Sequence, residues 1–321
     1  MFADVCDQEH AGAPSATAEV DFSYEEAFSR NIGLFTAEEQ QRLRRSHVAI
    51  AGMGGVGGVH LIALARTGIG KFTIADPDRF ELANMNRQYG ARVDTLGRSK
   101  VEVMAEAVRQ INPQALVRTF DKPIGTDNIA NFLESADVVI DGLDFYAMQA
   151  RRLLFRAAYE RGIWGITCGP HAFSAAHLVF SPYGMTFDAY FDLSDGMSEI
   201  DQSIAFGVGG TPRAIHLPYL DDLKKYFIPG ERRGASAGLT CQLASGIVAA
   251  DVIKLLLGRG TVRPVPAYLQ FDAYRQKLVR GTLWFGNRHP LQRIKIWWLT
   301  RKLVPAATAV RRSTTPSTRT S

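Results

Sequence analysis

Cysteine is scarce in this sequence: the 321 residues include only three, and no two of them form a C-x-x-C pair. Scattered cysteines support neither a disulfide framework nor a four-cysteine zinc site. The N-terminus has no basic-then-apolar signal pattern. A run of 18 apolar residues is also missing, because Asp251 and Lys254 interrupt the apolar stretch at 247–257. These absences favour a soluble, cytoplasmic protein, and no zinc is expected.

Acidic residues are absent from Gly281 onward. Eight basic residues lie in that stretch, namely Arg288, Arg293, Lys295, Arg301, Lys302, Arg311, Arg312 and Arg319. Subtracting these eight charges from the formal net charge of +5 leaves the rest of the chain at −3. The basicity is thus a property of the tail, and a nucleic-acid partner for the whole protein is not favoured.

Both ends of the chain are rich in small and polar residues. Residues 1–20 are rich in Ala with Gly, Pro, Ser and Thr, which predicts a flexible arm, and the composition from about 306 to the end predicts disorder. The remaining chain divides into a globular body at 21–280 and a basic tail at 281–321.

Short apolar runs alternate with helical patterns through the first part of the body. The predicted strands are 47–51, 71–75, 115–120, 137–140 and 163–168, and the predicted helices are 59–67, 99–111, 126–135 and 149–161. This rhythm predicts an α/β fold with right-handed crossovers, a Rossmann-like and mostly parallel sheet flanked by helices. Ligands of such sheets bind at the carboxyl ends of the strands.

A glycine-rich loop follows the first predicted strand. Gly52, Gly54 and Gly57 form a G-x-G-x-x-G pattern that opens a helix, with Gly55 between the last two. The absence of a Cβ lets a phosphate approach the backbone, and a helix N-terminus offers free N–H groups. Asp76 ends the next strand, where a carboxylate can accept hydrogen bonds from a ribose. The pattern predicts a nucleotide site but does not separate NAD, FAD and ATP.

A polar cluster beyond Asp76 favours one of these nucleotides. It holds Asn84, Arg87 and Gln88, and Lys100 follows at the start of a helix. A hydride-transfer domain does not need these groups, whereas nucleotidyl transfer needs fixed cations and magnesium to meet the charge on the phosphate oxygens. Asp144, after the fourth strand, is a candidate magnesium ligand.

Together these motifs resemble the ThiF/MoeB/HesA family, the bacterial relatives of ubiquitin-activating enzymes. The matching stretches are the glycine loop, the D-P-D … N-x-N-R-Q block, G-R-S-K and D-x-x-D. An R-N-I segment around Arg30 and the helix at 247–258 add to them, so the resemblance covers about 24–180 and 235–280. It implies that 21–280 is an adenylation domain.

The resemblance also implies a role for each position. Asp76 would hold the ribose, Asn84 and Arg87 would contact the triphosphate with support from Gln88, and Lys100 would contact the phosphates near the reacting centre. Asp144 would bind Mg²⁺, and Arg30 would reach across a homodimer into the partner's ATP site. The implied reaction is MgATP-dependent adenylation of a carboxylate with release of pyrophosphate. The acid would be the C-terminus of a ubiquitin-like or sulfur-carrier protein, a peptide or a small molecule.

The sequence departs from the family pattern at several places. The C-x-x-C pairs that hold zinc in many members are missing, and the crossover stretch has no cysteine. Cys241 beyond it is either a buried helix residue, which we favour, or a thioester-forming nucleophile. Phe145 stands where an asparagine is usual. Residues 181–236 form an insertion that either lies at the site, where it binds the substrate or covers the site, or elaborates the dimer surface. His171 and His177 are interpreted as structural.

Two questions stay open at this point. The tail around Trp297 and Trp298 either packs on the body through these side chains, which we favour, or binds an anionic membrane or a partner groove. The function also has rivals, since the glycine loop permits an NAD- or FAD-dependent oxidoreductase, and the fold permits a non-catalytic nucleotide-binding scaffold. The joint presence of Arg30, Arg87, Lys100 and Asp144 argues against both.

Overall fold

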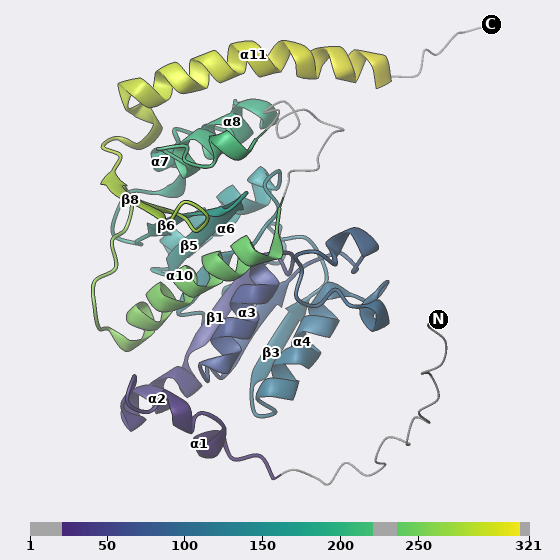
Figure 1. The fold of residues 1–321 in the computed structure, drawn as a ribbon, viewed down its shortest axis with the longest axis vertical. Helices are drawn as coiled ribbons and strands as arrows, with labels where there is room; N and C mark the ends of the chain where they lie inside the picture. Colours follow the sequence, from purple (N-terminus) through teal and green to yellow (C-terminus); the bar gives the residue numbers. More distant parts are fainter. Residues whose placement is uncertain (1–20, 221–235, 315–321) are drawn as a thin grey trace, which may run out of the picture.

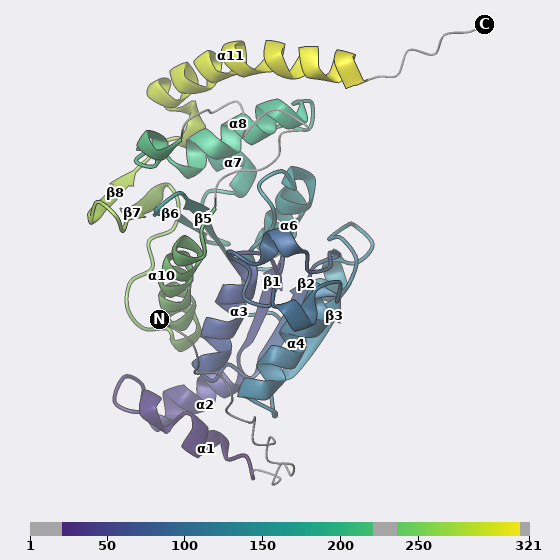
Figure 2. The same ribbon diagram turned by 45° about the vertical axis from the view of Figure 1, so that its right-hand side comes forward.

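The computed structural model describes residues 21–220 and 236–314, with side chains up to Leu303. The arm at 1–20 and part of the insertion lie outside the described residues. One eight-stranded sheet crosses the molecule in the order β3-β2-β1-β4-β5-β6-β7-β8 (Figures 1 and 2). Its first four pairings are parallel and its last three are antiparallel.

The parallel half contains the five predicted strands. These are β1 (His47–Ala51), β2 (Lys71–Ala75), β3 (Leu116–Phe120), β4 (Val138–Asp141) and β5 (Trp164–His171). The connecting helices are α3 (Gly57–Arg66), α4 (Lys100–Ile111), α5 (Ile129–Phe132) and α6 (Met148–Glu160). All lie within a few residues of the predicted bounds, so the predicted fold class is confirmed.

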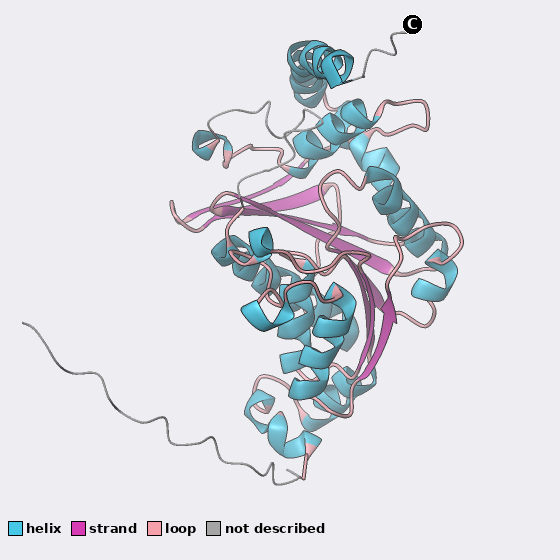
Figure 3. Ribbon diagram, turned by 90° about the vertical axis from the view of Figure 1, so that its right-hand side faces the viewer, coloured by secondary structure: helices cyan, strands magenta, loops and turns pink. Residues whose placement is uncertain are grey.

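Helices cover both faces of this half (Figure 3). Val48 and Ile50 of β1 pack in one core with α3, α4 and α10 (Gly238–Leu257), whereas Ala49 and Ala51 pack in a second core with α5 and α6. Successive side chains of a strand point to opposite faces, so a fully apolar strand fills two cores at once. This burial fixes where each strand ends.

The helix α10 closes one face of the sheet. By length and composition it could cross a membrane, but in the fold it packs against α3, β5 and β6 and supplies Val248, Val252 and Leu256 to the core. The core helix of a soluble protein passes the same test. At its far end Arg42 donates to the Leu257 carbonyl at 3.2 Å and joins α10 to α2 (Ala37–Arg45).

The antiparallel half was not predicted. A hairpin joins β5 to β6 (Ser174–Phe180), and β7 (Ala267–Asp272) and β8 (Lys277–Thr282) extend the sheet beyond them. The described part of the insertion forms α7 (Phe187–Phe191), α8 (Glu199–Gly210) and the short η4 (Leu217–Tyr219). Phe155, Phe180, Phe187 and Phe191 pack together beneath α7, so aromatic burial fastens the insertion to α6 and β6.

The tail differs from prediction in two ways. After η5 (Gly286–Arg288), α11 (Pro290–Thr314) runs past residue 306, where we expected disorder. It also packs on α8 through Ile296, Leu299 and Leu303 rather than through the tryptophans. Trp297 and Trp298 are 55% and 49% exposed, so the expectation that they pack on the body is wrong. With about 100° between successive residues of a helix, they lie on a different face of α11 from Ile296, Leu299 and Leu303.

Candidate functional site

The glycine loop between β1 and α3 is held against the loop that follows β4. Gly52 has φ of +92°, and a Cβ on it would stand 2.3 Å from the Gly142 carbonyl oxygen. A Cβ on Gly57 would stand 1.8 Å from the Gly52 carbonyl oxygen. Neither position accepts a side chain, so the loop keeps a bare backbone at the carboxyl ends of β1 and β4. Gly54 faces more open space, since a Cβ on it would meet only Gln88 Nε2 at 3.8 Å.

Asp76 fixes the entrance of this loop. Its Oδ2 accepts from the Met53 backbone N–H at 2.7 Å, and its Oδ1 accepts from the Asp78 backbone N–H at 2.9 Å. Burial raises the pKa of the Asp76 carboxyl, while the nearby Lys100 charge acts in the opposite direction. The carboxylate lies beside the glycine loop where the sequence predicts the ribose contact. That role stays a prediction, since both oxygens also carry backbone hydrogen bonds.

Lys100 lies buried at the N-terminus of α4 with its ammonium directed at two carboxylates. Its Nζ lies 3.0 Å from Asp78 Oδ2 and 4.0 Å from Asp76 Oδ1. The Asp78 side chain is 66% exposed, so this ion pair opens to solvent on one side. A buried cation at the strand ends, held by an exposed carboxylate that can turn away, suits a phosphate contact.

Asn84, Arg87 and Gln88 come from a single tight turn after η2 (Leu82–Asn84). The Asn84 carbonyl accepts from the backbone N–H groups of Arg87 and Gln88 at 3.1 and 2.9 Å. The Asn84 side chain accepts from the Glu81 N–H, and the Arg87 guanidinium donates to the Ala83 carbonyl and to Asn86. Among the described residues Arg87 has no acidic partner, which leaves it available to an anionic ligand.

Gln88 supplies a further sign of a ligand. It is buried, and within the described part of the chain its Oε1 has no hydrogen-bond partner. Its Nε2 lies 3.8 Å from where a Cβ on Gly54 would stand. A buried carbonyl oxygen without a donor is costly unless a ligand or water completes it. The polar turn therefore lies beside the glycine loop, and it holds a buried acceptor, Gln88 Oε1, that lacks a donor among the described residues.

Asp144 lies in the loop between β4 and α6. Its Oδ1 accepts from the Tyr146 N–H at 3.0 Å, and its side chain is exposed. Gly142, two residues earlier, packs against Gly52 and Gly57, so this loop borders the glycine loop directly. One exposed carboxylate beside bound phosphates is a common way for proteins to hold Mg²⁺. The fit is compatible with the metal role, which remains a prediction.

Arg151 organises this loop, and sequence reasoning does not identify it. Its Nε lies 2.7 Å from Asp141 Oδ2 in an ion pair that is almost fully buried. Its remaining N–H groups donate to the carbonyls of Leu143, Asp144 and Phe145. Because one guanidinium ties down three successive carbonyls, Arg151 sets the position of Asp144. No sequence feature distinguishes it from three other arginines of the same predicted helix.

The insertion reaches the Asp144 loop through Phe206 of α8. Its ring lies 5.6 Å from the Phe145 ring and 4.4 Å from the Arg151 guanidinium carbon. Phe145, which replaces the usual asparagine, therefore makes an aromatic contact with the insertion. Of the two expectations for residues 181–236, this contact favours a segment that covers the edge of the site.

Cys241 lies buried in the first turns of α10. A Cβ on Gly55 would stand 3.1 Å from its Sγ and 3.6 Å from Arg87 Cγ, so all three border one side of the glycine loop. Burial raises the pKa of the Cys241 thiol, against smaller opposing effects of Ser236 and Arg87. A buried thiol of raised pKa is a poor nucleophile, which favours the packing interpretation over a thioester.

Arg30 is the one predicted catalytic residue that lies away from the others. It is exposed on η1 (Ser29–Asn31), beside α1 (Tyr24–Ala27). Asn31 donates to the Thr67 carbonyl at the C-terminal end of α3, whereas the glycine loop opens the N-terminal end. A helix of this length separates the two by roughly 15 Å. Arg30 therefore does not belong to the glycine loop of its own chain.

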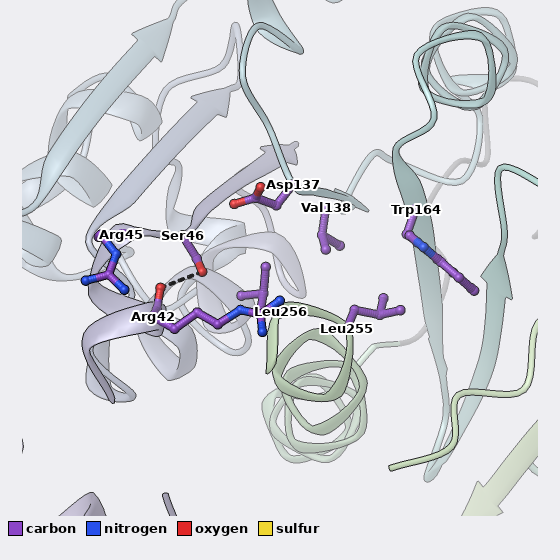
Figure 4. Close-up of a pocket in the computed structure, with 8 residues that line it drawn as sticks. All are labelled: Arg42, Arg45, Ser46, Asp137, Val138, Trp164, Leu255 and Leu256. Atoms are coloured by element: carbon purple, nitrogen blue, oxygen red, sulfur yellow. Dashed lines mark hydrogen bonds between the residues drawn. The ribbon is translucent and has the colours of Figure 1, made fainter. Parts of the chain in front are cut away.

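A surface hollow of about 360 Å³ opens at that same remote end (Figure 4). It is lined by Arg42, Arg45, Ser46, Asp137, Val138, Trp164, Leu255 and Leu256. Ser46 and Asp137 precede β1 and β4, whereas the polar groups described above follow these strands. The hollow thus lies at the wrong end of the sheet for that chemistry, and we assign it no part in the site.

Residues from the three loops that follow β1, β2 and β4 therefore meet at the carboxyl ends of these strands. They provide a glycine loop at the N-terminus of α3 and the two cations Arg87 and Lys100. They also provide the exposed carboxylate of Asp144 and the buried Gln88 Oε1, which lacks a donor among the described residues. The described residues fit a nucleoside triphosphate with its magnesium. Fixed cations at phosphate distance can stabilise charge that develops on a reacting phosphate.

The comparisons with known proteins point the same way. Residues 28–292 match the model described as the ThiF family. The tRNA threonylcarbamoyladenosine dehydratase of Haemophilus influenzae is 41% identical over 123 residues, which are 38% of this chain and 47% of that protein. The probable adenylyltransferase/sulfurtransferase MoeZ of Mycobacterium tuberculosis is 26% identical over 224 residues, 69% of this chain and 50% of its own length.

A solved structure of E. coli MccB with ATP has a similar fold. The TM-score is 0.60 at 19% identity, covering 81% of this chain and 71% of that one. At this identity the likeness concerns the fold alone. The chain spans about half the length of the curated relatives it matches.

Proposed function

Because this chain belongs to the ThiF family, we propose that it is an MgATP-dependent adenylyltransferase that activates a carboxylate and releases pyrophosphate. The observation that carries the proposal is the meeting of Arg87, Lys100 and Asp144 around the glycine loop. A hydride-transfer site does not need these groups, so family membership and site chemistry favour adenylation over an NAD- or FAD-dependent oxidoreductase. A non-catalytic scaffold would have no use for the three together.

In the proposed reaction the glycine loop and the N-terminus of α3 bind the phosphates, and Asp76 binds the ribose. A carboxylate oxygen of the acid attacks the α-phosphorus, and the bond to the pyrophosphate oxygen breaks. Arg87 and Lys100 stabilise the charge that grows on the phosphate oxygens. Asp144 holds the magnesium, which neutralises part of the triphosphate charge. The product is an acyl-adenylate.

The acid is proposed by class only. It is the C-terminus of a small carrier protein or a peptide, or a small carboxylic acid. A sulfur-carrier protein as the acid agrees with the name of the relative MoeZ, a probable adenylyltransferase/sulfurtransferase. Since the reaction consumes ATP, we also propose that the chain works in the cytoplasm.

Pyrophosphate exchange into ATP tests the reaction. Wild-type protein and Asp144→Ala are assayed side by side with carrier proteins ending in Gly-Gly, peptides and small acids. We expect exchange that requires one donor class and falls at least roughly a hundredfold in the variant. Donor-dependent exchange with unchanged rate in Asp144→Ala would remove Asp144 from the mechanism. Absence of exchange with all donors, together with NAD or FAD binding, would refute adenylation.

We further propose that the active unit is a homodimer in which Arg30 acts in the partner's site. This is supported by the exposure of Arg30 and its distance from its own glycine loop. Within the described residues it makes no hydrogen bond or ion pair.

Complementation tests this arrangement. Arg30→Ala and Asp144→Ala are purified alone and after co-expression. If Arg30 acts in trans, each variant is inactive, but the mixed dimer holds one intact site and restores up to roughly a quarter of wild-type exchange. If Arg30 acts in cis, the mixed dimer holds no intact site, and co-expression restores nothing.

A further inference from the structure

The tail helix α11 has two faces of different character. The face toward α8 is packed, since Gln292 donates to the Val208 carbonyl at 3.1 Å and Leu303 is buried against Ile204 and Val208. Between Gln292 and Leu303 the helix is therefore packed on the body. Figures 1 and 2 show it lying across one end of the molecule, beyond α8.

The opposite face is apolar and uncovered. Leu291, Ile294, Trp297 and Trp298 recur at helical spacing and are between 49% and 62% exposed. Just before the helix, Trp284 and Phe285 are 65% and 70% exposed. Single exposed apolar residues are ordinary, but four large ones on one face of a helix form a patch that normally has a partner. We call this the tryptophan face.

Positive charge surrounds the tryptophan face. Arg293, Arg301 and Lys302 lie on the same helix, whereas the Lys295 ammonium donates to the Pro212 carbonyl on the body side. The chain has no acidic residue from Gly281 to its end. The Arg301 guanidinium carbon lies 4.3 Å from the centre of the Trp297 ring, and Lys302 Nζ lies 4.8 Å from that of Trp298. The basic groups thus lie over the exposed rings and would approach any surface that those rings enter.

These charges identify the kind of partner. A second copy laid face to face would bring two sets of like charges together without acids between them, which costs energy. A negatively charged partner is favoured instead. A bilayer surface fits best because the helix lies across one end of the molecule, where a flat surface can reach it (Figure 1). Tryptophan rings settle at the lipid headgroup level, and basic residues pair there with anionic lipids.

We propose that the tryptophan face binds the surface of an anionic phospholipid bilayer, with α11 lying in the plane of the membrane. Arg301 and Lys302 pair with lipid phosphates, and Ile294, Trp297 and Trp298 enter the boundary between headgroups and acyl chains. The inference is independent of the adenylation chemistry, because the helix packs on α8 and not on the glycine loop.

Co-sedimentation with vesicles tests the proposal. The full chain is mixed with vesicles of phosphatidylcholine alone and with vesicles of phosphatidylcholine and phosphatidylglycerol. We expect binding to the anionic vesicles that weakens with salt, with a blue shift of tryptophan fluorescence. Ile294→Asp should reduce the binding at least about tenfold, and so should the paired changes Arg301→Glu and Lys302→Glu.

The matched control is Leu116→Asp. Leu116 is 66% exposed, close to the 61% of Ile294, but it lies on the edge strand β3 and should not affect vesicle binding. No binding to anionic vesicles, equal binding to both vesicle types, or equal loss in the control would overturn the proposal. So would a fall in the oligomeric mass of Ile294→Asp, since the face would then join two copies of the chain.

Discussion

The two halves of the sheet differ in what lies at the ends of their strands. In the parallel half, a glycine or a carboxylate stands at or just after the end of every strand that reaches the site, and polar groups from three loops converge there. In the antiparallel half, β6 is buried throughout and packs against an aromatic cluster beneath the insertion. Parallel strands bring their carboxyl ends to one edge, which gathers ligand-binding groups. Antiparallel strands alternate direction and serve here as a base for α7, α8 and α11.

Two neighbouring arginines of α6 also differ in the part of the molecule that they hold. Arg151 is buried with Asp141 and donates to three carbonyls of the Asp144 loop. Arg152, its neighbour in α6, points instead to Asp188 and Asp195 in the insertion, and Asp195 is largely exposed. Adjacent residues of one helix thus support the site in one direction and the insertion in the other.

The largest expected effect is the loss of stability when Arg151, rather than Arg152, is replaced. Arg151→Met leaves Asp141 buried without its cation, and we expect a loss of about 4 kcal/mol in the free energy of unfolding. Arg152→Met should cost about 2 kcal/mol or less, because Asp188 keeps Arg156 and contact with solvent. Urea denaturation of both variants measures the difference. Equal losses would show that the two ion pairs contribute equally to the free energy of unfolding, which would contradict the account.

A double variant then isolates the positioning role. Asp141→Asn with Arg151→Met removes both charges, which should recover part of the lost stability. Pyrophosphate exchange should not recover, because the three carbonyls around Asp144 still lack their donor. Recovery of exchange along with stability would contradict a positioning role for Arg151.

Glycine substitutions give the next effect in size. Gly57→Ala forces a Cβ against the Gly52 carbonyl, and we expect a loss of about 3 kcal/mol in stability and loss of ATP binding. Gly210→Ala, at the end of α8, meets no atom within 4 Å and should be neutral or slightly stabilising. Thermal unfolding and nucleotide titration compare them. Tolerance of Gly57→Ala would contradict the packed loop geometry.

Buried histidines should make the stability of the protein depend on pH, with a smaller effect than the substitutions above. Burial lowers the pKa of His60 in α3 to about 3, and neither ring nitrogen has a partner in the described part of the chain. Because the unfolded pKa is near 6.5, the unfolded state binds the proton first, and stability is lost as the pH falls below about 6.5. At pH 5 the loss is about 2 kcal/mol for this residue.

His60→Leu should remove that part of the acid sensitivity, as urea denaturation at pH 7.5 and pH 5 would measure. Burial also lowers the pKa of His171 at the end of β5 to about 3 and that of His216 in the insertion to about 4, so a residual acid sensitivity should remain. An unchanged pH dependence in His60→Leu would mean that the ring is protonated or solvated in the folded state.

Sequence alone predicted the parallel half well because its signals are local. A buried run, a glycine or acid at its end and a helix of matching period identify each β–α unit, and the glycine loop, Asp76 and Lys100 lie where expected. Only their joint pattern indicated adenylation. The roles of these residues in binding and catalysis stay predictions.

The remaining features depend on which surfaces meet. Arg151 resembles its helical neighbours until the fold directs it at Asp141. Trp297 and Trp298 were expected to pack because large aromatic residues usually do, but α8 meets the other face of α11. The strands β6 to β8 are defined by antiparallel partners distant in sequence, so no local pattern marks their register.

The central claim is that the carboxyl ends of the parallel strands form an ATP site. Calorimetric titration of MgATP, NAD and FAD into wild-type protein and Arg87→Ala tests it most directly. We predict that MgATP binds the wild-type protein, that Arg87→Ala weakens this binding at least about tenfold at an unchanged Tm, and that NAD and FAD do not bind. Binding of NAD or FAD in place of MgATP, or equal MgATP affinity in Arg87→Ala, would contradict the account.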